Sequence, residues 1–242
     1  MLFLLASCDN SSEERISMKK QTILSIAYIT LMSILLSSCS DESTSAETDT
    51  FDASVVCPAN LRGTFVDERD GQEYKYVTIG NQVWMAENLK FDAPYSLCYE
   101  KNEGFCDTFG RFYSLHENGE YIGLFDQELL DTICPAGWHV PSVDEWSVLI
   151  NDMGGEKKAL SRLYSSEDFD DLFIKSSDDC GFNSLPAGVW NLDGSLGGGG
   201  VSSVYWTSTA ENLSVSFGCF FSYNGIAFSA NYPKMSIRCV KD

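Results

Sequence analysis

The cysteines of this sequence are the side chains whose number and spacing most restrict its chemistry. The chain has nine cysteines, two histidines and no Cys-x-x-Cys pair. Zinc sites use closely spaced cysteines and histidines, so we predict no metal centre. The cysteines that follow residue 56 are Cys57, Cys98, Cys106, Cys134, Cys180, Cys219 and Cys239. Because their number is odd, at least one stays a thiol or pairs between chains even in an oxidising compartment.

Cys98 and Cys106 bracket a short loop that contains Glu and Gly, and we expect them to form a disulfide bond. A catalytic cysteine would need a neighbouring base to lower the pKa of its thiol, and the sequence identifies none. The sequence also lacks a Gly-x-Ser-x-Gly elbow, a P-loop, a Gly-x-Gly-x-x-Gly fingerprint and a His-Glu-x-x-His motif. We therefore predict a protein that is not an enzyme and holds no cofactor.

Carboxylates offer one further chemistry. The acidic cluster at 167–171 and the pair Asp178 and Asp179 could bind a hard cation such as calcium. Neither has the spacing of an EF-hand loop. In a protein with 35 Asp and Glu against 16 Lys and Arg, and a formal net charge of −19, such runs normally lie on solvated loops. The same charge excludes nucleic acid and anionic lipid surfaces as partners, because both would be repelled.

The N-terminal residues have the composition of an export signal. Met18 and two lysines precede an apolar run over 23–36, which ends at Leu36-Ser37-Ser38-Cys39. Such a sequence is typical of a secretory signal peptide, and it is shorter than the ~20 apolar residues of a spanning helix. The ending resembles the bacterial lipobox, which implies that Cys39 is lipidated. We assign residues 1–38 to the signal region and expect translation to start at Met18.

The segment 39–56 is rich in Ser, Thr, Asp and Glu. It can bury little apolar surface, so we predict a solvated tether behind the lipid anchor. The remaining residues, 57–242, form the predicted domain. We expect a protein of the bacterial cell envelope, attached to a membrane by its lipid, at the outer membrane or the cell surface.

Local patterns within the domain predict short strands and one clear helix. Strands over 64–66, 73–79 and 82–85, separated by Asp70-Gly71 and Gly80-Asn81, predict a three-stranded meander. Further strands are predicted over 204–208, 215–223, 226–229 and 235–240.

The clearest helix follows Ser142, which can form a capping box with Glu145. Apolar residues recur at helical spacing through 143–153, and a second helix is predicted over 156–164. His139 lies just before the first helix and is expected to pack against it or cap it. The glycine-rich stretch 191–203 predicts a mobile loop.

A series of motifs extends in order through nearly all of residues 57–242. They include Gly63-Thr64-Phe65-Val66-Asp67, Trp84-Met85-Ala86-Glu87-Asn88-Leu89, Gly110-Arg111-Phe112-Tyr113, Cys134-Pro135-Ala136-Gly137-Trp138-His139, Tyr205-Trp206-Thr207-Ser208-Thr209 and Ser236-Ile237-Arg238-Cys239-Val240. Together they resemble the Fibrobacter succinogenes major paralogous domain.

That family is similar to C-type lectin-like domains, and the group containing formylglycine-generating enzymes shares the broad fold. The resemblance implies an α+β, C-type lectin-like fold of mostly short antiparallel strands, one or two helices and long loops. It also implies a Cys134–Cys239 disulfide bond. Cys180 with Cys219 is then the expected third pair, which leaves Cys57 unpaired.

Calcium-dependent lectins hold their ion through a Glu-Pro-Asn or Gln-Pro-Asp tripeptide together with Trp-Asn-Asp. The nearest counterpart here is Trp190-Asn191-Leu192-Asp193, and the proline tripeptide is absent. We therefore expect no calcium-bridged sugar binding.

We predict a surface-anchored binding or adhesion module for a glycan or a surface protein, with its ligand face over 178–205. Trp190, Asn191 and Tyr223 are the expected contacts, because aromatic rings can stack on a sugar. One alternative is an enzyme related to formylglycine generation, which would need a reactive thiol pair such as Cys180 and Cys219. The other is a structural coat protein whose negative charge keeps cell surfaces hydrated and apart.

Overall fold

The computed structural model describes residues 49–94, 96–114, 116–117, 120–121, 127–165, 175–191, 193–212, 215–230 and 234–242. All of them belong to one unit, Asp49–Asp242. The predicted signal region 1–38, the lipidation site Cys39 and the acidic cluster at 167–171 lie outside the described residues. Among the residues that are described, no helix has the length and apolarity needed to cross a membrane.

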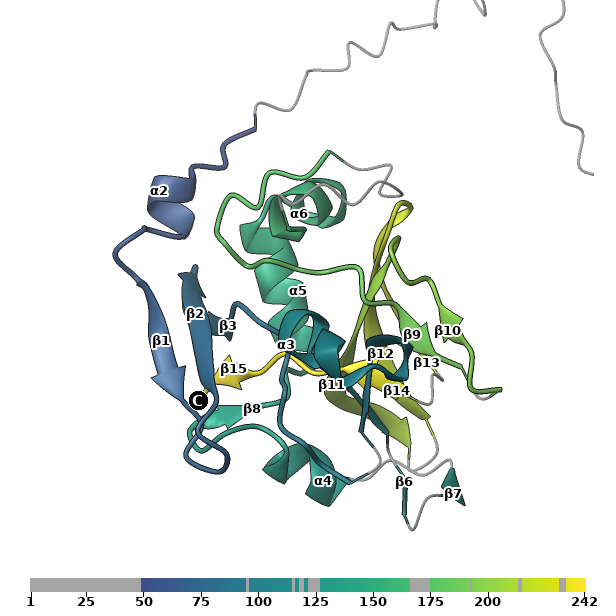
Figure 1. Ribbon diagram of the computed structural model, residues 1–242. Helices are drawn as coiled ribbons and strands as arrows, with labels where there is room; N and C mark the ends of the chain where they lie inside the picture. The colour runs from purple at the N-terminus through teal and green to yellow at the C-terminus, as the bar shows by residue number, and fades with distance from the viewer. Residues whose placement is uncertain are drawn as a thin grey trace, which may run out of the picture. The chain divides into compact units, whose positions relative to one another are not determined.

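A small antiparallel sheet joins the first strands of the body to the last (Figure 1). Its order is β1-β2-β3-β15-β8, formed by β1 (Arg62–Val66), β2 (Glu73–Ile79), β3 (Gln82–Met85), β15 (Val240–Lys241) and β8 (Trp138–His139). The predicted meander is confirmed, with Gly71 and Gly80 at positive φ in its turns. Side chains on the two faces of β2 enter different hydrophobic clusters. Tyr74 belongs to one cluster and Val77 to the other.

A larger sheet carries the order β10-β9-β14-β11-β12-β13, with β5 on β14 and β4 on β5. Its strands are β4 (Leu97–Cys98), β5 (Arg111–Ser114), β9 (Val189–Trp190), β10 (Leu196–Gly197), β11 (Ser203–Asn212), β12 (Val215–Ser222), β13 (Gly225–Ala230) and β14 (Lys234–Ser236). Only the β11–β14 pair is parallel among these described pairings. A separate hairpin joins β6 (His116–Glu117) to β7 (Glu120–Tyr121). The predicted α+β class is confirmed.

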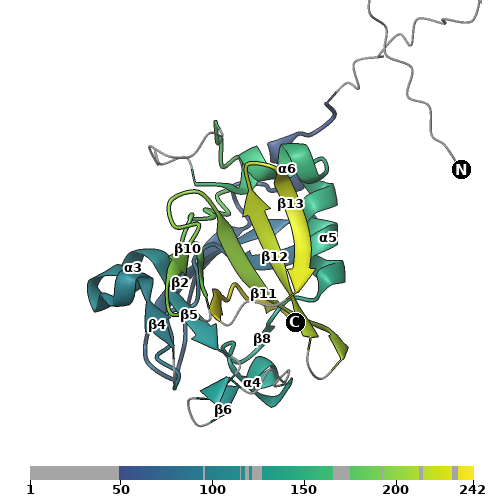
Figure 2. The same cartoon turned by 90° about the vertical axis from the view of Figure 1, so that its right-hand side faces the viewer.

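Two helices cover one side of the larger sheet (Figure 2). α5 (Val143–Asp152) contacts β11 and β12, and α6 (Glu156–Leu163) contacts β13. A short α4 (Gln127–Thr132) precedes β8. The predicted capping box is present: the Glu145 amide donates to Ser142 Oγ at 3.2 Å, and the Ser142 amide donates to Glu145 Oε2 at 2.8 Å. Both predicted helices are thus confirmed.

Trp146 of α5 lies at the centre of the core that joins helices and sheets. Its ring stacks on Tyr205 with centroids 5.3 Å apart and meets Phe182 and Phe221 edge-on. Trp84 of β3 packs against it at 4.7 Å. One tryptophan therefore contacts both sheets, which is why the helix cannot shift without disturbing either.

Arg238, just before β15, is fully buried. Its guanidinium donates to Asn88 Oδ1, to the Phe182 carbonyl and, at 3.1 Å, to the Asn183 carbonyl. It also lies 4.5 Å from the centroid of the Phe182 ring. A buried cation is tolerated only when its donors are satisfied, so these contacts fix two separate segments, at Asn88 and at 182–183, around one side chain.

Three disulfide bonds close the body. The predicted Cys98–Cys106 and Cys134–Cys239 bonds are confirmed. The third joins Cys57 to Cys180, with their Cα atoms 5.5 Å apart, so the predicted Cys180–Cys219 pair is wrong and Cys57 is not the unpaired cysteine. Cys219 is a free, buried thiol on β12, paired in register with Tyr205 and Phe228. Cys180 is already bonded to Cys57 and is therefore not available to Cys219.

Residues 49–56, predicted as the end of the tether, lie in the body. The carboxylate of Asp49 pairs with Arg162 and lies 3.5 Å from Lys158 Nζ, while the ring of Phe51 is 4.0 Å from the Arg162 guanidinium. The short α2 (Ala53–Val56) follows, capped by Asp52. Two basic side chains on α6 thus hold a segment whose composition alone indicated solvation.

His139 connects β8 to the capping box and to the end of the chain. Its Nε2 is 2.8 Å from Glu145 Oε1 and its Nδ1 is 2.7 Å from Asp242 Oδ1. The ring is 37% exposed. Both nitrogens can donate at once only in the imidazolium form. Burial opposes that charge, but the hydrogen bonds to Asp242 and Glu145 outweigh it and raise the pKa of His139 above 6.5.

We predict that removal of the Cys57–Cys180 bond, in a variant with alanine at both positions, lowers the free energy of unfolding by about 5 kcal/mol, because it closes a loop of 123 residues. The matched removal of Cys98–Cys106, which closes only 8 residues, should cost about 2.5 kcal/mol in the same model. Urea unfolding of both variants checks this. A larger loss for the short loop would contradict the chain-entropy argument.

We also predict a pH dependence of stability that arises from His139. Because its folded pKa is raised, the stabilisation is complete below the unfolded value of 6.5 and is lost as pH rises through the folded pKa. Glu145 sets the lower pH limit of this stabilisation. Although burial opposes its charge, bonds from Ser142 and His139 lower its pKa, so its contribution is lost as acid titrates it. Urea midpoints measured from pH 5.5 to 9 should fall in the parent and change less in His139→Gln. An identical profile in both proteins would refute the assignment.

Candidate functional site

The structure places the three predicted ligand residues apart. Trp190 lies on β9 and is only 5% exposed, whereas Tyr223 lies in the β12–β13 turn and is 67% exposed. Strands β14 and β11 separate β9 from β12 in the sheet. Asn191 donates from Nδ2 to Ser195 Oγ at 3.1 Å. Trp190 and Asn191 therefore share one site, Tyr223 does not belong to it, and Trp190 presents no open ring face for stacking.

What covers Trp190 is a disulfide-closed segment, residues 97–110, which we call the disulfide lobe. It contains β4, η1 (Tyr99–Lys101), η2 (Glu103–Phe105) and α3 (Cys106–Phe109). Two successive residues, Glu100 (φ 52°) and Lys101 (φ 56°), adopt the left-handed conformation. Neither is glycine, so each costs about 1–2 kcal/mol of backbone strain. The lobe must be held firmly for this strain to persist.

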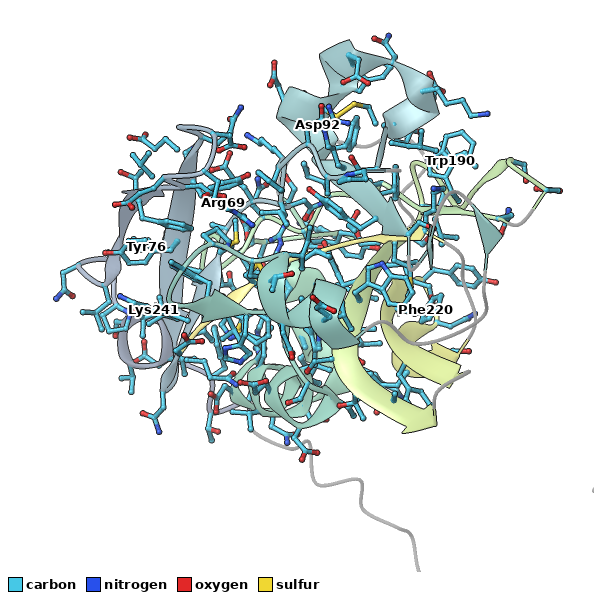
Figure 3. All side chains as sticks on the ribbon, turned by 90° about the horizontal axis from the view of Figure 1, so that it is seen from below. Arg69, Tyr76, Asp92, Trp190, Phe220 and Lys241 are labelled. Carbon is cyan, nitrogen blue, oxygen red and sulfur yellow. A yellow bond between two sulfur atoms is a disulfide. The ribbon has the colours of Figure 1, made fainter. Side chains whose placement is uncertain are left out.

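Arg111 of β5 supplies that hold. Its Nη2 is 2.8 Å from Glu103 Oε2 inside the lobe, and its Nη1 is 3.1 Å from Asp92 Oδ1. Arg111 itself is buried, so its stem and charge are fixed by the sheet. Asp92 and Trp190 lie near the lobe in Figure 3. The ion pairs and the disulfide bond therefore anchor the lobe from two sides.

The strained backbone places the Lys101 side chain over Trp190. Its Nζ lies 5.0 Å from the centroid of the indole, a distance at which the cation attracts the ring. Beside it, Tyr99 stacks on Phe109 with centroids 4.6 Å apart, and Phe105 meets Tyr99 edge-on. These three rings are partly exposed, and we call them the aromatic strip. The aromatic strip was not predicted, although two aromatic residues within the Cys98–Cys106 loop and a third three residues after it are visible in the sequence.

The stretch predicted as a mobile loop, 191–203, packs closely against this lobe. Its described residues include β10, and backbone bonds join Gly188 to Ser202 and Gly200 to Pro186, each at 2.8 Å. A Cβ at Gly199 would lie 2.7 Å from the Tyr99 hydroxyl. The glycines therefore allow close approach, and backbone hydrogen bonds tie the described part of this stretch to its neighbours; its mobility stays a prediction. We call residues 197–200 the glycine loop.

Metal chemistry has little support at this site. Within the described part of the chain, one group has ligand atoms all within 4.8 Å of one another: Cys98, Glu103 and Cys106. Its sulfurs are joined in a disulfide bond and cannot act as thiolates. The carboxylate of Asp193, in the segment compared with calcium lectins, accepts from the Ser195 amide and hydroxyl at 2.9 and 2.6 Å.

The enzyme alternative required Cys180 and Cys219 as a pair of reactive thiols, and they are not both free. Cys180 is bonded to Cys57. Burial raises the pKa of the remaining thiol, Cys219, well above its usual value, so this thiol is a poor nucleophile at neutral pH.

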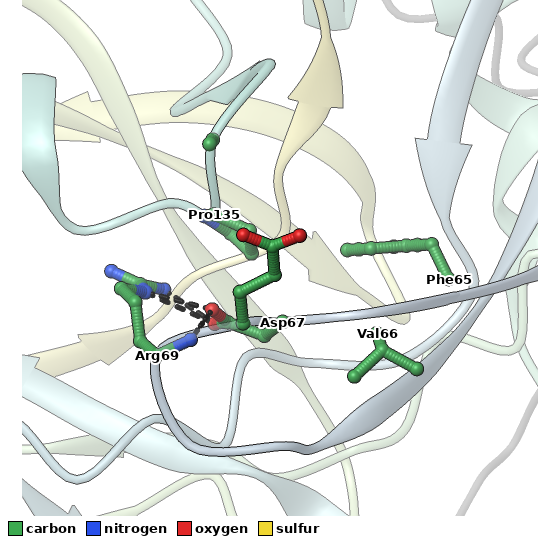
Figure 4. Close-up of a pocket in the computed structure, with 7 residues that line it drawn as sticks. Phe65, Val66, Asp67, Arg69 and Pro135 are labelled. Carbon is green, nitrogen blue, oxygen red and sulfur yellow. Dashed lines mark hydrogen bonds and ion pairs between the residues drawn. The ribbon is translucent and has the colours of Figure 1, made fainter.

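A hollow of 370 Å³ opens beside β1 (Figure 4). It is lined by Phe65, Val66, Asp67, Glu68, Arg69, Pro135 and Ala136. The buried carboxylate of Asp67 is paired with Arg69 at 2.7 Å, and Arg69 also donates to the carbonyls of Thr132 and Ile133. Because Asp67 and Arg69 satisfy each other, this hollow is a weaker candidate than the disulfide lobe.

Comparisons with known proteins agree with the motif pattern. The sequence model of the Fibrobacter succinogenes major domain matches residues 77–241, which include the lobe, the glycine loop and Trp190. A search of curated proteins and a search of solved structures found no match. The match covers more than half of the chain, and the chain therefore belongs to the Fibrobacter succinogenes major domain family.

Proposed function

We propose that this protein is a lipid-anchored, non-enzymatic module of the bacterial cell surface that binds a glycan through a C-type lectin-like fold. Its ligand face is formed by the disulfide lobe and the glycine loop. The observation that carries the proposal is the strained pair Glu100 and Lys101, which holds an ammonium group 5.0 Å from the Trp190 ring.

Backbone strain of this kind persists only where the surrounding structure imposes it, and it is concentrated at ligand sites. Here a disulfide bond and the Arg111 ion pairs impose it. A fold that needed only to close the end of its sheet could do so with glycine at these positions, at no such cost. The strain supports a role for the exact position of Lys101.

The side chains around Lys101 suit a sugar. Carbohydrate rings pack on aromatic faces, and their hydroxyl groups bond to charged and amide side chains. The aromatic strip supplies the first kind of contact. Exposed side chains of the lobe, Lys101, Asn102 and Glu103, supply the second.

Export and anchoring are proposed on separate grounds. Three disulfide bonds are typical of a protein that folds in an oxidising compartment. The signal sequence and the lipobox ending at Cys39 supply a route and an anchor, and several acyl chains hold a protein to a membrane firmly. No particular observation favours the enzyme or the coat protein over the binding module.

We predict that Lys101→Ala weakens glycan binding roughly tenfold, the equivalent of about 1.4 kcal/mol, with at most a small fall in Tm. The variant removes a cation from the proposed ligand face, and it also removes the attraction of that cation for the Trp190 ring, which is worth about 0.5–1 kcal/mol at an exposed site. Binding of the purified domain would be measured by calorimetry on glycans selected from an array. The matched control is Lys241→Ala, an exposed lysine of β15 in the small sheet (Figure 3). Equal affinities for the parent and both variants, or no retained glycan at all, would overturn the proposal.

A further inference from the structure

The outer edge of β1 is open to pairing with another chain. β1 is the outermost strand of the small sheet (Figure 1), and among the described residues β2 is its only strand partner. The pairing runs without a bulge over all five residues, and the strand contains no proline. Natural proteins usually protect a free edge with a bulge, a proline or an inward-pointing charge. β1 has none of these, because its one charged residue, Arg62, is exposed.

The backbone groups that face outward can be assigned from the bonds at the two ends of β1. The Leu61 carbonyl accepts from the Thr78 amide at 2.9 Å, and the Asp67 amide donates to the Gln72 carbonyl at 2.8 Å. In an antiparallel pair the direction of the backbone groups alternates along the strand. The residues whose N–H and C=O groups point away from β2 are therefore Arg62, Thr64 and Val66.

This outward row of donors and acceptors matches a second copy of itself. When two β1 strands run antiparallel with Thr64 opposite Thr64 of the second copy, Arg62 of each copy lies opposite Val66 of the other. Each outward N–H group then meets an outward C=O group of the second copy. A two-fold symmetric interface requires a surface that is complementary to itself in this way.

The same register brings an exposed apolar side chain to a hollow. Leu61 is 44% exposed, and in this arrangement Leu61 of the second copy lies opposite Asp67. Because side chains alternate along a strand, Leu61 and Phe65 share one face. Phe65 and Asp67 line the hollow of 370 Å³ beside β1, together with Pro135 and Ala136. Leu61 of each copy is thus directed toward the hollow of the other.

Charges on the opposite face of β1 are also complementary. Glu73 of β2 lies beside Val66 in register, and Arg62 of the second copy would lie on the other side of Val66. Both charged side chains are exposed, and opposite charges on neighbouring strands attract. The net charge of −19 on each copy opposes association, but exposed charges more than about 8 Å apart are largely screened at physiological ionic strength.

We propose that β1 is the interface of a two-fold symmetric homodimer, in which the small sheets of two copies join through antiparallel β1 strands into one continuous sheet. The partner is a second copy of this chain, because the backbone groups, the exposed leucine with its hollow and the charges all match in one register. The inference goes beyond the proposed function and does not depend on it. A dimer would carry two disulfide lobes, so that its binding to a surface with many ligands would be multivalent.

Cysteine cross-linking of the purified full chain tests the register. Thr64→Cys should form a reducible dimer under mild oxidation, because opposite Cα atoms in such a pair lie about 5.5 Å apart, within the range of a disulfide bond. Arg62→Cys and Val66→Cys should each give little dimer alone, since like positions lie roughly 13 Å apart along the strand, but a mixture of the two should cross-link. Val148→Cys, exposed on α5, is the matched control for random collisions.

Sedimentation equilibrium of the full chain tests the association itself. We expect the parent to dimerise and Thr64→Pro to associate at least tenfold more weakly, because proline removes an outward N–H group. Proline is tolerated on an edge strand where its nitrogen faces solvent, so Thr64→Pro should keep its Tm. Thr64→Val keeps the backbone donor and should dimerise like the parent.

Three outcomes would overturn the homodimer. They are a monomeric parent, a Thr64→Pro variant that dimerises like the parent, and cross-linking of Thr64→Cys no stronger than that of Val148→Cys or of Val66→Cys alone. A monomeric parent would show that the edge of β1 does not bind a second copy of this chain.

Discussion

The buried guanidinium of Arg238 is the constraint on which the rest of the body depends. It cannot be hydrated, so Asn88, Phe182 and Asn183 must stay close enough to accept its hydrogen bonds. Its neighbour Cys239 is bonded to Cys134. The last strand is thus fixed at adjacent positions by a covalent bond to Cys134 and by a desolvated cation, and removal of either would leave the strand held by the other alone.

The proposed ligand site is connected to Arg238 through a short series of contacts. Asn88 accepts from Arg238 and donates from Nδ2 to the Phe109 carbonyl of the disulfide lobe at 2.8 Å. Gly110, which follows the lobe, approaches Asn88 so closely that a Cβ would lie 2.6 Å from that of Asn88. On the other side, β14 ends two residues before Arg238. The lobe and the end of β14 are therefore positioned by the same buried charge.

Local features of this fold could be predicted from the sequence, because neighbouring residues determine them. The meander follows from Gly71 and Gly80, the start of α5 from Ser142 and Glu145, and the Cys98–Cys106 bond from its short loop. Features that depend on distant partners were missed. The Cys57–Cys180 bond spans 123 residues, and many pairings of seven cysteines are compatible with one sequence.

The same difference between neighbouring and distant partners explains why the structure of the site could not be predicted. A polar, acidic segment such as 49–56 reads as solvated until Arg162 and Lys158 are seen beside Asp49. A glycine run reads as mobile until Tyr99 occupies the space that side chains would fill. Trp190 was singled out by its type, and its burial under Lys101 depends on two left-handed residues that no local pattern indicates.

An acidic ligand is compatible with a chain of net charge −19, because the two effects act over different distances. At physiological ionic strength, exposed charges more than about 8 Å apart are largely screened. The net charge therefore slows the approach of an anion but contributes little once it is bound. At the proposed ligand face the acting cation is Lys101, whose Nζ lies 5.0 Å from the centroid of the Trp190 ring. A charge this close to a ligand outweighs distant, screened negative charges, so binding at the proposed face would be decided by the local arrangement that Arg238 and the lobe hold in place.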